Sequence, residues 1–288
     1  MPKFKISRIL APTDFSDLAT QALRYAGELA KRTGSELVVL YADPFLPPPH
    51  FTSAQIDSIA SALAAQKENA KVELGKYVSE IISVEVRHQT MVVEGHAVSA
   101  IVQTAEEIDA SVIVMGTHGR SGLNRLMLGS VTERVLHETS RPLLTVRPSD
   151  RAVEAASAPP TILCPVSRRD DTLEVLEQAI DFAESIGARI SILHVRESSG
   201  DIDGGALRDL ESWIPERLRA NTSITMLEGD PAEVVIEHAR SSNADLIIIG
   251  ARHRPFSDTT VIGTTTSRIT RHAPCPVLTI MMKPEATH

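Results

Sequence analysis

Residues 112–132 read VIVMGTHGRSGLNRLMLGSVT, and this stretch decides the fold. It begins with four apolar residues, three of them β-branched, which is typical of a buried strand. Gly116 and Gly119 end the apolar run, and Gly129 and Ser130 stand ten residues further on, before a segment with helical periodicity. The order of strand, glycine-bordered loop and helix predicts one step of a parallel sheet that is covered by helices.

The same alternation extends over residues 1–148. Short apolar runs predict strands, and apolar residues at three- and four-residue spacing predict helices. Ser16 is suited to cap the first helix and Gly34 to end it. The expected strands are 7–12, 36–42, 83–93, 111–116 and 142–147, and the expected helices are 16–32, 52–82, 96–108 and 130–139.

A second copy of this pattern occupies residues 161–288. Its strands are expected at 161–166, 189–195, 223–228, 245–250 and 276–281. An offset of 134 positions carries Gly116 onto Gly250 and Gly129 onto Gly263, whereas an offset of 153 relates the first strands of the two copies. The first copy therefore has 19 more residues between its second and third strands. We predict two α/β domains, 1–148 and 161–288, joined by a proline-ended linker at 149–160.

The amino-acid composition excludes some classes of function. The 288 residues have a net charge of −8, with 15 basic and 16 acidic residues in 1–148 and 14 and 21 in 149–288. An acidic chain with only ten aromatic residues is unsuited to general nucleic-acid binding. No apolar stretch reaches the length of a membrane span, so we expect a cytoplasmic protein with Cys164 and Cys275 reduced.

The glycine-bordered loop is a candidate anion site. Glycine permits a positive φ and lets backbone N–H groups approach a phosphate, and Ser130 would stand at a helix N-terminus, which favours an anion. In the alternative, Gly116 and Gly119 only form a turn, while Ser130 caps its helix and Glu133 completes a capping box. The sequence leaves both interpretations open.

Asp14 is the second candidate, because it directly follows the first predicted strand. Ligands of open α/β sheets bind at the carboxyl ends of the strands. If the first and fourth strands are neighbours, Asp14 faces the glycine loop, where it can accept ribose hydroxyls or help to hold a phosphate-bound Mg²⁺. The alternative role for Asp14 is an Asx turn or a helix cap.

With these residues, each half of the chain resembles a universal stress protein domain. The resemblance extends over nearly the whole chain. Gly116, Gly119, Gly129 and Ser130 reproduce the ATP-binding signature of that family. The resemblance implies two tandem Rossmann-like domains of the adenine nucleotide alpha hydrolase type, each an open five-stranded parallel sheet of order 3-2-1-4-5 flanked by helices. It also implies that ATP is bound, with Mg²⁺ as an optional companion.

The resemblance extends to further site residues. It implies that Asp14 contacts ribose or the metal and that Val131 joins Ser130 near the phosphates. The adenine and ribose side would be lined by Pro12, Thr13, Ala42 and Met115.

The second copy departs from the pattern. His253 replaces the second glycine and Ser167 stands where Asp14 would be expected. We therefore predict that this copy does not bind ATP in the same manner. The basic triplet at 252–254 is expected to form a solvated loop, although it could instead hold a phosphate or face a partner.

The function predicted from these features is that of an ATP-binding stress or regulatory protein that acts through conformational change and unidentified protein partners. The alternatives are a slow ATP-hydrolysing or AMP-transferring enzyme and a nucleotide-free scaffold or chaperone-like dimer. No catalytic residue is assigned, and at most a weak ATPase is expected. The fifth strands should lie at sheet edges. The resemblance implies dimerisation through these strands, so we expect the two copies to pack as an internal pseudo-dimer and two chains to associate as a homodimer through edge strands. The alternative is a monomer.

Overall fold

The structure is a computed structural model of the chain. It describes residues 4–43, 53–118, 128–147, 159–167, 172–196, 214, 216, 219, 222–256 and 259–282; within these ranges the side chains of 53–64, 172, 253–256 and 259–262 are not described.

The first unit alternates strands and helices as the sequence predicts. The helix α1 shows how local signals set its ends: Ser16 accepts a hydrogen bond from the backbone N–H of Ala19, and Gly34 ends the helix with a φ of 67°. The elements are β1 (Arg8–Thr13), α1 (Asp17–Thr33), β2 (Glu36–Asp43), α2 (Ser53–Ile81), β3 (His88–Glu94), α3 (Ala97–Glu107), β4 (Val112–Gly116), α4 (Ser130–Glu138) and β5 (Leu143–Val146).

The second unit repeats this order with one difference. Its fourth strand runs on past Gly250 and returns as an antiparallel hairpin, in which Ile262 pairs with His253. The basic triplet therefore lies in a strand, and the expectation of a loop there was wrong. The elements are β6 (Thr161–Val166), α5 (Thr172–Ile186), β7 (Arg189–Arg196), β8 (Thr222–Glu228), α7 (Pro231–Ser241), β9 (Leu246–Phe256), β10 (Thr259–Ile262), α8 (Thr264–His272) and β11 (Val277–Met282).

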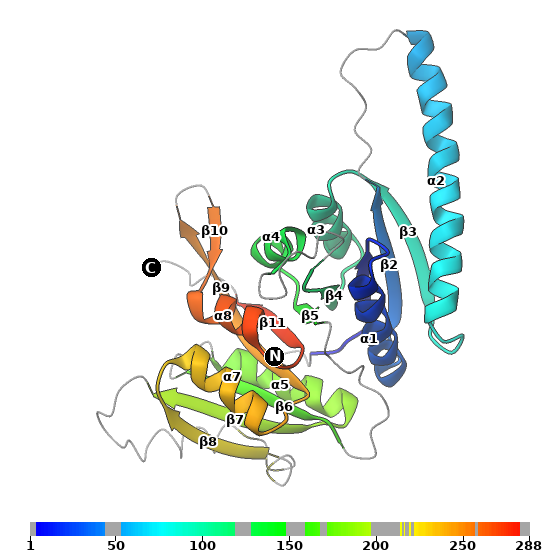
Figure 1. Cartoon of the computed structure of the whole chain (residues 1–288). Helices are drawn as coiled ribbons and strands as arrows, with labels where there is room; N and C mark the ends of the chain where they lie inside the picture. The colour runs from blue at the N-terminus through cyan, green and yellow to red at the C-terminus, as the bar shows by residue number, and fades with distance from the viewer. Residues whose placement is uncertain are drawn as a thin grey trace.

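The strands of both units form one continuous sheet (Figure 1). Its order is β3-β2-β1-β4-β5-β11-β9-β6-β7-β8, with β10 paired to β9 outside this path. Within each unit the pairings along this path are parallel and the order is 3-2-1-4-5. The predicted Rossmann-like architecture is confirmed.

The two units meet through their fifth strands, which pair in antiparallel fashion. Leu144 lies opposite Leu278, which is its own counterpart at the 134-residue offset, so a pseudo-twofold axis passes through this pair. The expected internal pseudo-dimer is confirmed. Because these two edges cover each other, a second chain cannot pair with them, and a homodimer would have to use another surface.

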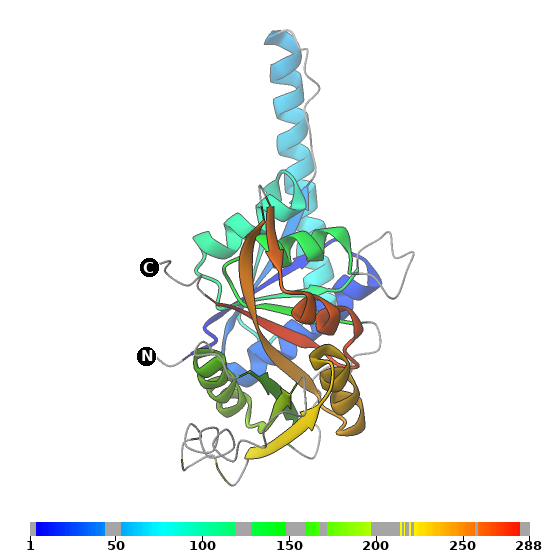
Figure 2. The ribbon, with the colours of Figure 1, turned by 90° about the vertical axis from the view of Figure 1, so that its left-hand side faces the viewer.

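Helices cover both faces of the sheet (Figure 2). On one face the buried side chains of α1, α2 and α5 belong to a single apolar cluster that spans both units. On the other face, α3 with α4 and α7 with α8 cover two separate clusters. The units are also joined by a hydrogen bond of 2.7 Å from the backbone N–H of Phe4 to Asp181 Oδ2. The shared cluster makes the two units one folding body.

The long helix α2 contains the extra length of the first unit and projects beyond the body of the protein in Figures 1 and 2. Its last turns are anchored in the core, since Leu74 and Val78 are fully buried. Among the described helices none combines the length and apolar character needed to cross a bilayer. The cytoplasmic location stays a prediction.

Candidate functional site

The candidate site residues of the first unit lie at the carboxyl ends of its strands. β1 pairs directly with β4, so the condition set by the sequence for Asp14 to face the glycine segment is met. The structure places the predicted residues as follows: Pro12 and Thr13 end β1, Asp14 follows it, Ala42 lies near the end of β2, and Met115 and Gly116 end β4.

Asp14 forms the Asx turn that was its alternative role. Its Oδ1 accepts hydrogen bonds from the backbone N–H of Ser16 at 3.0 Å and from Ser16 Oγ at 2.6 Å. Ser16 in turn caps α1. The turn holds the carboxylate beside the end of β4, which is where a ligand of this edge would lie. A structural role and a ligand contact are compatible, because a carboxylate has about four lone-pair positions.

An aromatic cluster supports the turn after β1. Phe15 has a φ of 63°, which is rare for a residue other than glycine. Its ring lies 5.0 Å from the rings of both Tyr41 and Tyr77, and its backbone N–H donates to Thr13 Oγ1. The hydroxyls of Tyr77 and Thr20 are 2.8 Å apart, which connects α2 to α1. No local pattern in the sequence predicts this cluster, because its rings come from three separate segments.

Position 116 requires a glycine because its surroundings leave no room for a Cβ atom. It has no positive φ, contrary to the conformational role predicted for it. A Cβ there would lie 2.7 Å from Leu18 Cγ and 3.3 Å from the carbonyl oxygen of His118. The strand end therefore touches the first turn of α1 and the start of the glycine segment. Only a glycine allows this close approach without displacing a neighbour.

The N-terminus of α4 lies at the same edge, against the end of β4. Gly129 is the N-cap, and no side chain caps the helix among the described residues. Ser130 is the first helical residue, so the predicted capping box is wrong; Glu133 instead forms an ion pair with Arg271 of α8. Helix geometry leaves the N–H groups of Ser130, Val131 and Thr132 without intrahelical acceptors.

Two hydrogen bonds hold α4 against the end of β4. Thr132 Oγ1 donates to the carbonyl oxygen of Gly116 at 2.8 Å. The backbone N–H of Gly129 donates to the carbonyl oxygen of Thr117 at 2.6 Å. They bring the two ends of the glycine segment together. Gly119, and with it Arg120 and Arg125, lies outside the described residues, so the prediction for Gly119 stays untested.

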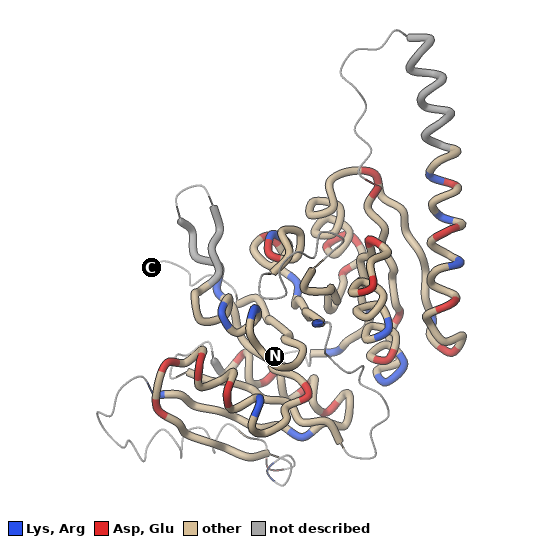
Figure 3. The backbone as a smooth tube through the Cα atoms, viewed as in Figure 1, with Lys and Arg blue, Asp and Glu red and all other residues tan. Residues whose placement is uncertain are grey.

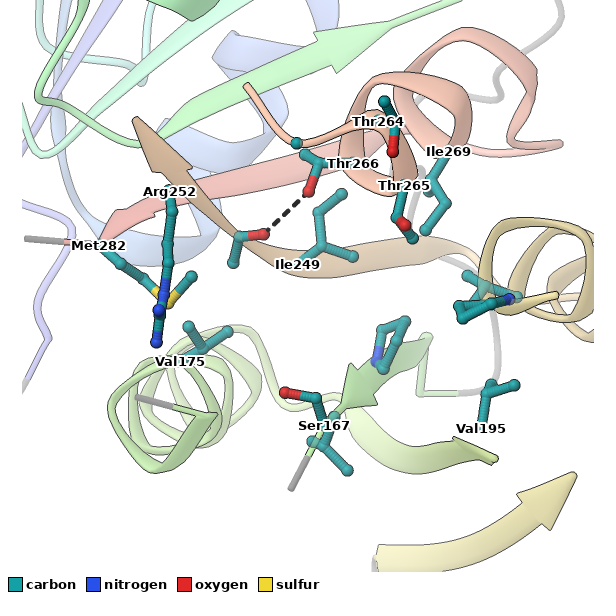
Figure 4. Close-up of a pocket in the computed structure, with 16 residues that line it drawn as sticks. Ser167, Val175, Val195, Ile249, Arg252, Thr264, Thr265, Thr266, Ile269 and Met282 are labelled. Carbon is teal, nitrogen blue, oxygen red and sulfur yellow. Dashed lines mark hydrogen bonds between the residues drawn. The ribbon is translucent and has the colours of Figure 1, made fainter. Parts of the chain in front are cut away.

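A cavity of about 350 Å³ occupies the corresponding edge of the second unit (Figure 4). Its walls include the repeat counterparts of the first-unit candidates at offsets of 153 and 134. Pro165, Val166, Ser167 and Val195 correspond to Pro12, Thr13, Asp14 and Ala42, and Ile249, Gly250, Gly263, Thr264 and Thr265 correspond to Met115, Gly116, Gly129, Ser130 and Val131. Sequence reasoning missed this cavity, although the same offsets locate its walls.

The helix attachment is repeated in the second unit. Thr266 Oγ1 donates to the carbonyl oxygen of Gly250 at 3.2 Å, as drawn in Figure 4, which matches the bond between Thr132 and Gly116. A Cβ at Gly250 would lie 2.8 Å from Val175 Cγ2 and 2.9 Å from Met282 Cε. Both units therefore build the same junction of strand end and helix N-terminus.

Charges around the second-unit cavity are balanced between α7 and α8. Figure 3 shows acidic residues along α7 and basic residues on α8. Arg268 bonds both carboxylate oxygens of Asp230 and reaches Glu233. The backbone N–H of Glu233, followed by Arg268, holds the pKa of the Asp230 carboxyl below its usual value.

The described residues give little support for a metal site or a reactive thiol. These contain no group of three or more His, Cys, Asp or Glu side chains that could hold a metal ion. Cys164 and Cys275 are buried and form no disulfide, and burial raises the pKa of the Cys164 thiol to about 12. A thiol with that pKa is unreactive at neutral pH.

The fold and the two matching strand-end sites define a tandem α/β protein of the doubly wound class. The family description "Universal stress protein family" matches residues 5–147 and 160–280. The chain belongs to the universal stress protein family.

Individual relatives agree with this assignment. A universal stress protein of Methanocaldococcus jannaschii is 34% identical over 143 residues, which cover 49% of this chain and 81% of that protein. One from Mycolicibacterium smegmatis is 23% identical over 299 residues and covers 94% of this chain and 96% of its own. The crystal structure of a universal stress protein from Archaeoglobus fulgidus superposes with a TM-score of 0.74 at 23% identity, covering 96% of this chain and 99% of that one. This likeness shows the shared two-unit fold.

Proposed function

We propose that the first unit, within the predicted boundaries 1–148, binds ATP and that binding alters a surface used by a protein partner in a stress response. The observation that carries the proposal is the N-terminus of α4, which no described side chain caps and which lies against Gly116 at the end of β4. The neighbouring strand β1 ends just before Asp14. N–H groups at a helix N-terminus and the helix dipole favour a phosphate. The predicted spacing of Gly116, Gly119, Gly129 and Ser130 adds support.

Each first-unit residue would have a distinct part. The N–H groups of Ser130 and Val131 and the Ser130 hydroxyl would donate to phosphate oxygens. Asp14 would accept from the ribose or contact Mg²⁺. The apolar side of the edge, formed by Pro12, Thr13, Ala42 and Met115, would receive the base.

Mg²⁺ would arrive with the nucleotide. One carboxylate with its Oδ1 engaged in an Asx turn is a poor metal site by itself. Mg²⁺ is commonly held by one or two carboxylates together with substrate phosphates, and this donor set fits Asp14. When bound, the ion would neutralise phosphate charge.

The test is a calorimetric titration of ATP into the full chain. Ser130→Ala and Asp14→Asn are each expected to weaken ATP binding about tenfold, because each loses a hydrogen bond to a charged or polar ligand group. Thr264→Ala, the matched change in the second unit, is expected to alter the affinity less than about twofold. Equal losses in all three variants, or none in any, would contradict the site.

The alternative functions give different results in the same experiment. Multiple turnover of ATP that disappears with Asp14→Asn would favour an enzyme. No ATP binding by the wild-type chain, and no nucleotide released when the purified protein is denatured, would favour a nucleotide-free scaffold. The expected result is saturable binding without appreciable turnover.

A further inference from the structure

The second-unit cavity has walls that suit an apolar body. Val195 replaces Ala42, Val166 replaces Thr13 and Ile249 replaces Met115 at positions related by the repeat. Val235 of α7 and Ile269 of α8 add further aliphatic surface from the opposite side. A volume of about 350 Å³ lies within the range of small-molecule sites. The cavity therefore has the volume of a small-molecule site, and its walls are more aliphatic than the corresponding positions of the first unit.

The loop that would surround a polyphosphate in the first unit is replaced by a hairpin in this unit. The residues that correspond to the glycine loop form the hairpin of β9 and β10, with Phe256 opposite Thr259 and His253 opposite Ile262. Successive N–H groups of an extended strand point in opposite directions, so they cannot converge on one phosphate group. The hairpin also contacts α4 of the first unit, so it forms part of the contact between the units.

The ribose partner is also changed. Ser167 stands in the place of Asp14, and it lines the cavity with a neutral hydroxyl. A hydroxyl lacks the negative charge with which a carboxylate would accept from sugar hydroxyls or hold Mg²⁺. The glycine loop and the carboxylate, by which the first unit would select a nucleoside triphosphate, are therefore missing, whereas the N-terminus of α8 remains in the cavity wall and can accept a single anionic group.

One positive charge remains in the walls. Arg252 is half-buried and lines the cavity, and the labelled side chains in Figure 4 place it on the side of Val175 and Met282. Thr264 and Thr265 add exposed hydroxyls at the start of α8. Two carboxylates of α7 that would repel an anion, Asp230 and Glu233, are bonded to Arg268.

We propose that the second-unit cavity binds a small organic anion with an apolar body and a single charged group, and that it does not bind a nucleotide. The aliphatic walls would hold the body, and the Arg252 guanidinium would hold the charge. This site is independent of ATP binding in the first unit. The chain would then respond to two chemically different ligands.

The probe for the test is 8-anilinonaphthalene-1-sulfonate, which has an aromatic body and one sulfonate and fluoresces when it enters an apolar site. The full chain is expected to bind one equivalent saturably. Arg252→Met should weaken binding at least about tenfold, because a charge-assisted hydrogen bond is lost, and Arg252→Lys should recover part of it.

A matched pair of variants separates the two units. Thr265→Trp fills the second-unit cavity from an exposed position, and Val131→Trp makes the same change at the counterpart position of the first unit. Thr265→Trp should abolish probe binding and leave ATP binding within about twofold of wild type, whereas Val131→Trp should do the reverse. Because both positions are exposed, both variants should fold, and circular dichroism checks this.

Several results would overturn the proposal. Displacement of the probe by ATP or AMP would make the cavity a nucleotide site. Equal effects of Thr265→Trp and Val131→Trp on the probe, or no saturable binding at all, would remove the second site. A failure of ATP to bind the wild-type chain would contradict the function proposed for the first unit alone, because the probe titration does not depend on it.

Discussion

Gly116 and Gly263 show that a glycine in a repeated sequence pattern need not be required for a positive φ. Neither has a positive φ. Gly116 lies against Leu18, whereas a Cβ at Gly263 would meet nothing within 4 Å. The spacing of glycines was visible in the sequence, but the reason for each glycine depends on which side chain lies beside it.

We expect Gly116→Ala to destabilise the protein by about 1–3 kcal/mol, because the added Cβ would lie 2.7 Å from Leu18 Cγ and overpack the strand end. Gly263→Ala, the change at the other glycine, is expected to stay within about 0.5 kcal/mol of wild type. Urea denaturation of the two variants measures the difference. Equal destabilisation would mean that the close approach at Gly116 is unimportant.

At the scale of elements, polar contacts connect helices to segments that are distant in the sequence. Arg141, just before β5, bonds Glu106 of α3 and also Asp109. Arg271 joins α8 to Glu133 of α4 across the two units. These pairs were not predictable from local patterns, because their partners are separated by about 35 residues in one case and 138 in the other.

The contact at Glu106 predicts an acid-sensitive contribution to stability. Hydrogen bonds from Arg141, and next from Ser140, hold the pKa of the Glu106 carboxyl below its ordinary value of 4.5. A carboxyl whose pKa is lower in the folded state stabilises the protein above pH 4.5, and this contribution is lost as the pH falls through the folded value.

Glu106→Gln should therefore be less stable than wild type at neutral pH, with the difference shrinking as the pH falls below 4.5. Urea denaturation at a series of pH values measures it. Glu107→Gln is the control, since Glu107 is exposed and forms no ion pair within the described part of the chain. A pH-independent difference would refute the prediction.

The pair of Arg271 and Glu133 lies one turn inside α4, near the N-terminus where we propose that phosphate binds. Arg271→Ala would leave the Glu133 carboxylate unneutralised there. We expect ATP binding to weaken about threefold, or roughly 0.6 kcal/mol, at low salt and less at high salt.

The double variant Arg271→Ala with Glu133→Gln should restore the affinity, because it removes the repelling charge as well. Calorimetric titrations at two salt concentrations measure both effects. If the double variant binds ATP as weakly as Arg271→Ala, the effect would be structural instead of electrostatic.

At the scale of the whole molecule, the β5–β11 contact joins two homologous units into one sheet, and a shared apolar cluster packs them together on one face. The fifth-strand edges are thereby covered, and β3 and β8 remain the outer strands of the sheet. The pseudo-twofold axis at Leu144 and Leu278 shows that the repeat in the sequence is also a symmetry of the fold.

This arrangement predicts a single cooperative unfolding transition. Leu278→Asp places a carboxylate in a fully buried position at the contact and should cost about 3–5 kcal/mol and split the transition in two. Leu227→Asp, on the partly exposed surface of β8, should leave one transition. Differential scanning calorimetry distinguishes these results, and two transitions in the wild-type chain would contradict the single folding body.

The sequence by itself determined the repeat, the strand and helix positions within a few residues, the sheet order through the family resemblance, and the candidate residues at the carboxyl edge. These follow from local periodicity and from an offset that can be counted. The β-branched run at 259–262 is a local signal for the hairpin, but the basic triplet at 252–254 was expected to form a solvated loop. Only the tertiary structure decided that Ser130 is not a cap, that Gly116 is needed for space and that a cavity lies in the second unit. These outcomes depend on side chains brought together from distant segments, and no local pattern encodes the packing of residues that meet only in the folded chain.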